Sequence, residues 1–307
     1  MSRKIVWPHN KKFAFTIVDD TDNSCLSNIK PIYDYLLSKG ILTTKTTWVY
    51  PSRNHYFGDT LMNDDYLKYL LMLKTNGFEI GLHNVGSGDF SRSEIIEGIN
   101  LFKEKIGDYP NLHINHSNNK DNIYWGYERF YGLTRFIYKN IRKTIPSFGN
   151  DSNSGFFWGD YCKKYFKYIR GKTFNNINTL KEDKYLVYEE SEKQKYSNYW
   201  FSSSSTIDGK SFKKLLTKKN IDKLERENGC CILYTHFAYG FLDENGKLDE
   251  EVKDVLDYLS KKDGWFVPAS TILDFVVSEN KRFDMHPSKY YLRKLSFKWL
   301  VERGIKG

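Results

Sequence analysis

Cysteine and proline are scarce in this 307-residue chain, which contains four cysteines and seven prolines. Cys230 and Cys231 are adjacent, and no cysteine belongs to a Cys-x-x-Cys pair, so the pattern indicates neither a zinc ribbon nor a disulfide framework. Residues 1–10 lack the apolar core of a signal peptide, and no apolar run is long enough to span a bilayer. We therefore expect reduced cysteines and a cytoplasmic protein.

Several functional motifs are also missing from the sequence. A phosphate-binding P-loop and a Gly-x-Ser-x-Gly elbow are both absent, which argues against a kinase and against a serine esterase. The formal net charge of +9 favours an anionic partner, a membrane surface or no specific partner. Because no dense block of lysine and arginine with interleaved glycines occurs, we do not expect a nucleic-acid partner.

Glycine recurs at one kind of position along the chain. Each of five glycines follows a helix-like segment and precedes an extended apolar run, and a glycine just past a helix end accepts the left-handed conformation that closes the helix. The repetition of helix, glycine and strand predicts βαβ units with a mostly parallel sheet, which can close into a barrel or stay open. The five glycines are Gly40, Gly77, Gly107, Gly229 and Gly264.

This rhythm covers most of the chain, so we predict a single domain over residues 1–307. It fades over about residues 117–199, where aromatic residues crowd and where we expect an elaboration that covers one rim of the sheet. Aromatic side chains pack in cores and also line sugar-binding clefts. The tail, about residues 284–307, has the pattern of a basic amphipathic helix, which would either pack on the domain or contact a membrane surface.

Polar residues with metal-binding chemistry stand at the ends of the predicted strands. Asp19 and Asp20 end the first strand, and His83, His116 and His236 end three later ones. In parallel α/β folds functional groups collect at the carboxyl ends of strands, so we expect these side chains to converge. Aspartate and histidine together are a typical ligand set for a divalent metal that keeps one position open for water.

The adjacent carboxylates also need an explanation, because two like charges repel unless a cation or a shared proton relieves them. Neighbouring residues on an extended chain point to opposite sides, and the backbone turns at a strand tip. We therefore expect Asp20 to face a metal and Asp19 to face the substrate water. Asp22 is expected to orient Asp19 or a substrate hydroxyl, or to cap the helix that starts near Asn28.

Four segments resemble motifs of the polysaccharide deacetylase superfamily, the NodB-homology or carbohydrate esterase family 4 group. They are FTIVDDTD, FEIGLHN, CCILYTHF and GWFVPASTILDFV, and the resemblance covers roughly residues 10–117 and 200–278. It implies an α/β fold, a distorted (β/α)7-type barrel of about seven strands with its site at the C-terminal rim. It also implies the hydrolysis of N-acetyl or O-acetyl groups on sugars.

The resemblance assigns a role to each matching residue. It implies that Asp19 is the general base, Asp20 a metal ligand, His83 the first metal histidine and His236 the general acid. Such a site needs a metal to polarise the carbonyl, a base for the water and an acid for the leaving amine. Zinc is the expected metal, with cobalt, nickel and manganese as alternatives.

The sequence departs from the family at the second metal histidine, where Ser87 stands four residues after His83. We predict His116 as the third ligand because it lies at the next strand tip. His113 is the reserve or a core histidine, and Asp89 is a further alternative. The family's Arg-Pro-Tyr motif is also absent, which leaves the oxyanion donor unassigned.

These observations predict a sugar deacetylase that serves bacterial surface-polysaccharide biosynthesis. A cytoplasmic location points to a precursor substrate, such as a nucleotide sugar, a lipid-linked sugar or a short glycan. The alternative is a barrel that has lost turnover and that binds a glycan or scaffolds a partner, since its ligand set departs from the family pattern. The oligomeric state is left open by the sequence.

Overall fold

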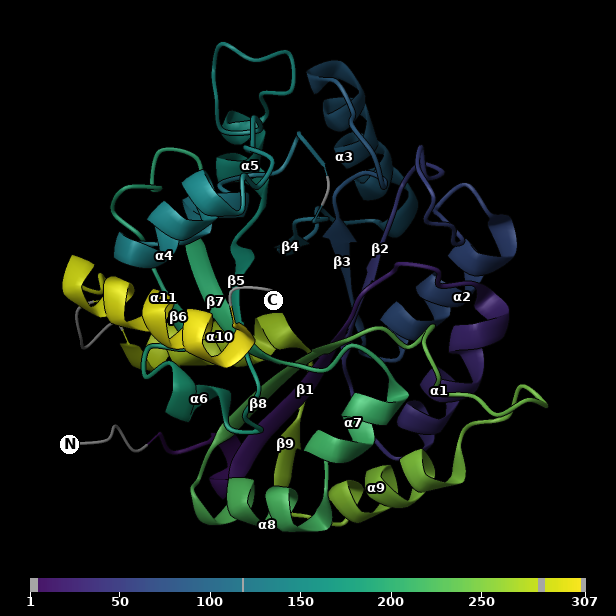
Figure 1. The fold of residues 1–307 in the computed structure, drawn as a ribbon. Coiled ribbons are helices and arrows are strands. Elements are labelled where there is room, and N and C mark those ends of the chain that lie inside the picture. Colours follow the sequence, from purple (N-terminus) through teal and green to yellow (C-terminus); the bar gives the residue numbers. More distant parts are fainter. Residues whose placement is uncertain (1–4, 118, 281–284, 305–307) are drawn as a thin grey trace.

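Seven parallel strands close into a barrel in the computed structural model, which describes residues 5–117, 119–280 and 285–304. Each strand pairs with the next, and the last pairs with the first, so the predicted (β/α)7-type barrel is confirmed (Figure 1). The barrel strands in order are β1 (Phe13–Asp19), β2 (Thr44–Thr47), β3 (Glu79–His83), β4 (Leu112–Ile114), β5 (Tyr168–Phe174), β7 (Tyr199–Ser205) and β8 (Cys230–Thr235).

Two short strands lie beside the closed barrel. β9 (Gly264–Phe266) runs parallel to the first half of β1, on the edge that β2 occupies farther along. β6 (Val187–Tyr188) pairs antiparallel with β7. These two strands are added to the sheet, and the seven barrel strands remain closed.

Helices surround the strands, and each presents apolar residues to them (Figure 1). No described helix is long and apolar enough to cross a membrane. The surrounding helices are α1 (Leu26–Ser38), α2 (Asp64–Thr75), α3 (Arg92–Ile106), α5 (Gly159–Tyr165), α6 (Thr179–Glu182), α7 (Gly209–Leu215), α8 (Lys218–Arg226) and α9 (Glu250–Ser260), and a short 3-10 turn, η1 (Pro8–Asn10), precedes β1.

Strand alternation divides the core into two layers. Phe15 and Ile17 of β1 face outward and pack with the surrounding helices. Ala14 and Val18 face inward and pack with α10 (Ala269–Asn280). The backbone N–H of Ala269 donates to Thr44 Oγ1 at the start of β2, at 2.9 Å. α10 therefore covers the N-terminal end of the barrel and leaves the C-terminal end, the mouth, for a site.

The connection after β4 forms part of the mouth and contains η2 (Gly126–Arg129), α4 (Gly132–Phe136) and the π-helical turn η3 (Ile137–Ile141). Helix α11 (Lys289–Arg303) packs on α4 and β5, so the predicted tail helix does lie on the barrel. Residues 281–284 and 305–307 of that region lie outside the described residues. The predicted rim elaboration over residues 117–199 is too wide, because β5 is itself a barrel strand.

Candidate metal centre

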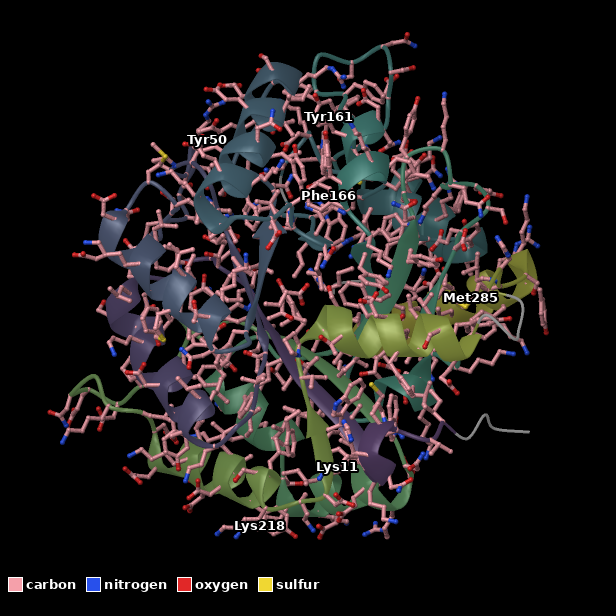
Figure 2. The ribbon with its side chains drawn as sticks, turned by 180° about the vertical axis from the view of Figure 1, so that it is seen from behind. Lys11, Tyr50, Tyr161, Phe166, Lys218 and Met285 are labelled. Carbon is pink, nitrogen blue, oxygen red and sulfur yellow. The ribbon has the colours of Figure 1, made fainter. Side chains whose placement is uncertain are left out.

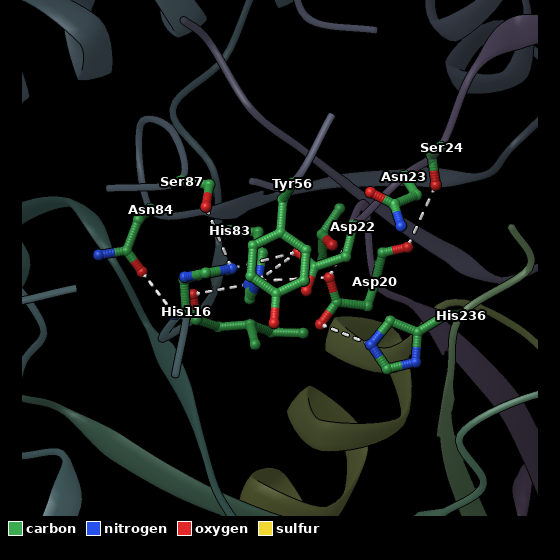
Figure 3. A network of polar contacts seen from close by, with 12 residues as sticks. Asp20, Asp22, Asn23, Ser24, Tyr56, His83, Asn84, Ser87, His116 and His236 are labelled. Atoms are coloured by element: carbon green, nitrogen blue, oxygen red, sulfur yellow. Dashed lines mark hydrogen bonds and ion pairs between the residues drawn. The ribbon is translucent and has the colours of Figure 1, made fainter. Parts of the chain in front are cut away.

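Residues from four strands meet at the mouth of the barrel (Figure 3). Asp20 and Asp22 follow β1, His83 ends β3, His116 lies two residues after β4, and His236 follows β8. Two overlapping groups have ligand atoms within 4.8 Å of one another. They are Asp22 with His83 and His116, and Asp20 with Asp22 and His236. Parallel pairing brings these distant segments together, because it places the carboxyl ends of all seven strands at one end.

The side chains lie at distances that a shared cation would bridge. His83 Nε2 is 3.3 Å from Asp20 Oδ1 and 3.5 Å from Asp22 Oδ1. His116 Nε2 is also 3.5 Å from Asp22 Oδ1. The three predicted ligands Asp20, His83 and His116 are therefore brought together, with Asp22 between the two imidazoles.

Hydrogen bonds orient each imidazole so that its Nε2 atom faces the carboxylates. His83 Nδ1 lies 3.1 Å from the carbonyl oxygen of Ile114, which can only accept, so Nδ1 carries the proton. His116 Nδ1 lies 3.0 Å from Asn119 Oδ1, an oxygen that also accepts from the Gly88 N–H. This is the arrangement of metal-binding histidines, in which one ring nitrogen donates to an outer partner and the other binds the ion.

Two buried atoms in this group lack a hydrogen-bond partner among the described residues, Asp22 Oδ1 and His83 Nε2. An unpartnered buried polar atom is costly, and here a carboxylate oxygen faces imidazole nitrogens. Burial opposes the charge of Asp22, but the two imidazoles 3.5 Å away outweigh burial and lower its pKa. Imidazole nitrogens with carboxylate oxygens are a zinc-type donor set, so the residues present fit a divalent cation.

Ser87 explains how His116 reaches this position. Ser87 Oγ lies 3.3 Å from His116 Nε2, and the backbone N–H of His116 donates to Asn84 Oδ1 at 2.8 Å. The position at which the resemblance led us to expect a second metal histidine is thus filled by a small hydroxyl residue. The imidazole from the next strand lies in the space beside it.

The orientation expected for Asp19 is wrong. Asp19 is fully buried, and its Oδ2 forms an ion pair of 2.8 Å with Lys45, which is also fully buried. Tyr33 donates its hydroxyl to the same oxygen at 3.1 Å, and the Phe237 N–H donates to Oδ1 at 2.8 Å. Because Asp19 continues the outward side of β1, it faces the layer beneath α1 and not the water at the mouth.

The two alternative ligands do not join the centre. His113 faces outward between Trp158 and Phe166, at ring-centroid distances of 5.2 and 5.3 Å, and burial lowers its pKa to about 3. It is therefore a neutral core histidine. Asp89, between β3 and α3, forms an ion pair of 2.7 Å with Lys120 of the connection after β4 and so links these two loops.

His236 lies at the edge of the centre, with 13% of its side chain exposed. Its Nδ1 lies 3.0 Å from the carbonyl oxygen of Ile207, and its Nε2 lies 3.5 Å from the Tyr234 hydroxyl and 3.6 Å from Asp20 Oδ2. The Tyr234 hydroxyl donates to the same Asp20 oxygen. Burial raises the pKa of Tyr234 well above its usual value, so this hydroxyl keeps its proton. His236 can therefore exchange a proton with a molecule in the mouth.

Asp22 does not cap the following helix, which was one of the roles expected for it, and its Oδ1 faces His83 and His116. The helix after it is capped by Cys25 and Asn28, whose side chain accepts from the Cys25 N–H at 2.8 Å. The spacing of Asp20 and Asp22 was an available signal, since residues two apart at a strand tip can share one side. Tyr56, which lies against His116 with ring centroids 5.0 Å apart, was not predicted either (Figure 3).

Comparison with known proteins gives the fold a context. No family model matches the sequence, and no curated protein matches it. A solved structure described as a putative polysaccharide deacetylase from Mycobacterium smegmatis is 11% identical, with a TM-score of 0.53 over 93% of this chain and 96% of that chain. A structure described as PuuE allantoinase is 13% identical, with a TM-score of 0.51 over 90% and 92% of the two chains. The expected resemblance to the deacetylase superfamily is confirmed at the level of the fold.

Proposed function

We propose that this protein is a metal-dependent hydrolase that removes an acyl group, most simply N-acetyl, from a sugar. The observation that carries the proposal is the convergence of Asp20, Asp22, His83 and His116 at the mouth of a deacetylase-like barrel. Two of their buried atoms lack a partner that a cation would supply. Amide hydrolysis is the reaction for which this fold and this donor set are jointly suited.

Asp20, Asp22, His83 and His116 would hold the cation, for which zinc is the first choice and cobalt, nickel or manganese are alternatives. When bound, the cation would polarise the acyl carbonyl and lower the pKa of a water molecule. Tyr234 would hold Asp20 in place through its hydroxyl. The second imidazole nitrogens, fixed by Ile114 and Asn119, would keep the rings oriented.

We assign proton transfer to His236. With Nδ1 held by the carbonyl oxygen of Ile207, the His236 imidazole would take a proton from the attacking water at Nε2. The imidazolium then delivers that proton to the nitrogen of the leaving amine. Asp19, predicted as the general base, is enclosed by Lys45 and Tyr33 and is left out of this scheme.

The substrate that we propose is an activated or lipid-linked sugar in bacterial surface-polysaccharide biosynthesis, handled in the cytoplasm. The net charge of +9 supports this choice, because such precursors carry phosphate groups. The alternative is a catalytically inactive glycan-binding barrel. It is favoured by one specific observation, the burial of Asp19 away from the mouth.

Metal content and acetate release distinguish the two functions. We would measure bound metal by elemental analysis and acetate release from a nucleotide-linked N-acetyl sugar. We expect about one divalent ion per chain. We also expect loss of the ion in Asp20→Ala, and loss of acetate release with retained metal in His236→Ala. Asp65→Asn, on the exposed face of α2, is the matched control. Wild-type protein without stoichiometric metal, or Asp20→Ala with unchanged metal, would overturn the enzyme proposal.

A further inference from the structure

Arg170 is a buried cation without an anionic partner beside the proposed metal centre. It lies on β5 with 5% of its surface exposed, and its Nε is an unpartnered buried atom among the described residues. Its guanidinium carbon lies 3.7 Å from the ring centre of Tyr234, the residue whose hydroxyl donates to Asp20. The described part of the chain provides no ion pair for Arg170. Burying an unpaired charge is costly, so the site calls for an anion.

The surroundings of Arg170 add to the positive charge. Arg303 donates to Thr173 Oγ1, three residues along β5, at 2.9 Å. Arg129 stacks on Trp125 at 3.8 Å and lies 5.5 Å from the ring centre of Trp299, one turn before Arg303. Neither arginine forms an ion pair with a described carboxylate. Burial, together with repulsion from Arg170, lowers the pKa of both.

The nearby carboxylates are already bound by other residues. Glu190 forms an ion pair of 2.7 Å with Lys193 and accepts from the Tyr131 hydroxyl at 2.9 Å. Asp183 accepts from Ser202 at 2.7 Å and from Tyr291 at 2.8 Å. The positive charge of Arg170 and its neighbours is therefore not balanced from within this part of the barrel.

We propose that Arg170, with the added positive charge of Arg129 and Arg303, forms an anion-binding subsite that takes a phosphate or carboxylate group of the substrate. A guanidinium group offers paired N–H donors that match either oxyanion. The subsite deepens the proposed function, on which it rests, by making the substrate an acidic sugar derivative. It also places part of the positive charge of the chain beside the proposed metal centre.

Anion binding tests this subsite without any need for turnover. Inorganic phosphate and acetate, as separate probes for the two oxyanions, would be titrated calorimetrically into protein treated with EDTA. We expect one of them to bind wild type, and Arg170→Met to weaken that binding at least about tenfold. Arg226→Met, on the exposed surface of α8, is the matched control and should bind as wild type does.

Circular dichroism would establish that Arg170→Met folds. If it does not fold, Arg170→Lys decides, since it keeps the charge but loses the paired donors and should bind more weakly than wild type. The subsite is overturned if wild type binds neither anion or if the folded Arg170 variant binds like wild type. If anion binding depends on Arg170 but the protein releases no acetate, the proposed function is contradicted and the subsite is supported.

A second inference concerns an apolar and basic surface formed by α4, η3 and α11. Leu133 and Phe136 are each 59% exposed, and Phe297 and Val301 of α11 are 52% and 66% exposed. Leu133 and Phe297 line one surface depression together with Gly132, Arg293, Lys294 and Lys298. Contiguous exposed apolar residues mark interaction sites on proteins.

The charge of this surface has one sign. Residues 129–145 and 285–301 contain no aspartate or glutamate. Lys289 and Lys298 pair with Glu192 and Glu182, but Arg293 and Lys294 have no carboxylate partner among the described residues. Exposed apolar side chains flanked by unpaired cations match the interface of an anionic bilayer, where the apolar groups insert and the cations meet the headgroups.

We infer that the α4–α11 surface, defined by Leu133, Phe136, Arg293, Lys294, Phe297 and Val301, docks on an anionic phospholipid membrane. α4 belongs to the connection that leaves the mouth, and α11 packs on it. Docking through this surface would hold the mouth near lipid-linked molecules. This inference is independent of the metal centre.

Vesicle sedimentation tests this surface. We expect binding to phosphatidylcholine vesicles that contain phosphatidylglycerol, little binding to pure phosphatidylcholine, and release at high salt. Leu133→Ser with Phe297→Ser, and separately Arg293→Glu with Lys294→Glu, should weaken binding about tenfold or more. The matched controls are Met62→Ser, 52% exposed elsewhere, and Lys218→Glu with Lys219→Glu on α8.

Figure 2 shows Lys218 at the lower end of the molecule, away from Met285, which precedes α11. The inference is overturned if the control variants weaken vesicle binding as much as the surface variants do. It is also overturned if the wild-type protein does not bind anionic vesicles. A concentration-dependent dimer that the surface variants abolish while vesicle binding stays unchanged would overturn it as well, because the occupant would then be a second copy of the chain.

Discussion

Individual residues at the end of β1 have opposite environments because their side chains alternate. Asp19 continues the outward row of Phe15 and Ile17, and its charge is neutralised by Lys45 within the protein. Asp20 begins the mouth and contacts His83. Adjacent carboxylates therefore need not share a function, since each obtains its counter-charge from a different layer of the barrel.

Lys45→Met should leave Asp19 buried and unpaired. We expect the free energy of unfolding to fall by about 3–5 kcal/mol, the usual cost of removing one partner from a buried ion pair. Urea denaturation followed by circular dichroism would measure the change. Lys68→Met, whose lysine is 76% exposed and pairs with Asp65, should change stability by less than about 1 kcal/mol. Equal stability of Lys45→Met and wild type would show that the pair is not a structural requirement.

The buried carboxyl group of Asp121 should make the stability of the folded protein depend on pH. It is fully buried, its Oδ1 lacks a partner among the described residues, and burial raises its pKa to about 7. The folded state therefore binds more protons than the unfolded state between about pH 4 and pH 7, and this carboxyl lowers stability as the pH rises through that window. The loss amounts to about 4 kcal/mol by pH 8.

The matched variant is Asp121→Asn, which removes the titration. Its stability relative to wild type should increase by about 3 kcal/mol between pH 5 and pH 8. Thermal unfolding at both pH values would measure this difference. An advantage that does not change with pH would mean that Asp121 ionises in the folded protein as it does in the unfolded chain.

At the scale of elements, α11 shows how one helix serves two surfaces. Leu292, Leu295 and Trp299 face the barrel and are buried, whereas Phe297 and Val301 face outward. Trp299 packs on Phe130, with ring centroids 4.6 Å apart. The amphipathic pattern in the sequence therefore located the helix correctly, while the exposed apolar residues belong to a second, unpartnered face.

Trp299→Ala tests the anchoring of α11. We expect the free energy of unfolding to fall by about 3–5 kcal/mol, because a large buried aromatic side chain leaves a cavity. Phe297→Ala, on the exposed face of the same helix, should change stability by less than about 0.5 kcal/mol. Chemical denaturation of both variants would measure the contrast. A similar effect of the two substitutions would mean that α11 is not anchored through its buried row.

At the scale of the whole molecule, the candidate ligands come from β1, β3 and β4, which are separated along the chain and joined by the closed barrel. A cation held by all three would link these segments in the folded state alone. Metal binding should therefore stabilise the fold as a unit, since an ion that binds only the folded state shifts the unfolding equilibrium.

Adding zinc to protein treated with EDTA should raise the unfolding temperature. At a free concentration one hundred times the dissociation constant, the gain is about 2.7 kcal/mol. Asp22→Asn should lose most of this gain, and Asp65→Asn should keep it. Calorimetric scans with and without zinc would measure both. A zinc-dependent shift that persists in Asp22→Asn would remove Asp22 from the ligand set.

Local patterns along the chain were sufficient to predict a mostly parallel α/β fold and the strand-end positions of Asp20, His83 and His116, and the closed barrel was expected from the resemblance to the deacetylase superfamily. These features depend on periodicity and on parallel pairing, which place successive strand ends at one end of the fold. The orientation of Asp19, the choice between a core position and a ligand position for His113, and the approach of Asp22 to both imidazoles were decided by tertiary structure. Each depends on which layer a side chain enters and on partners such as Lys45 and Trp158, which are distant in sequence and meet only when the barrel closes.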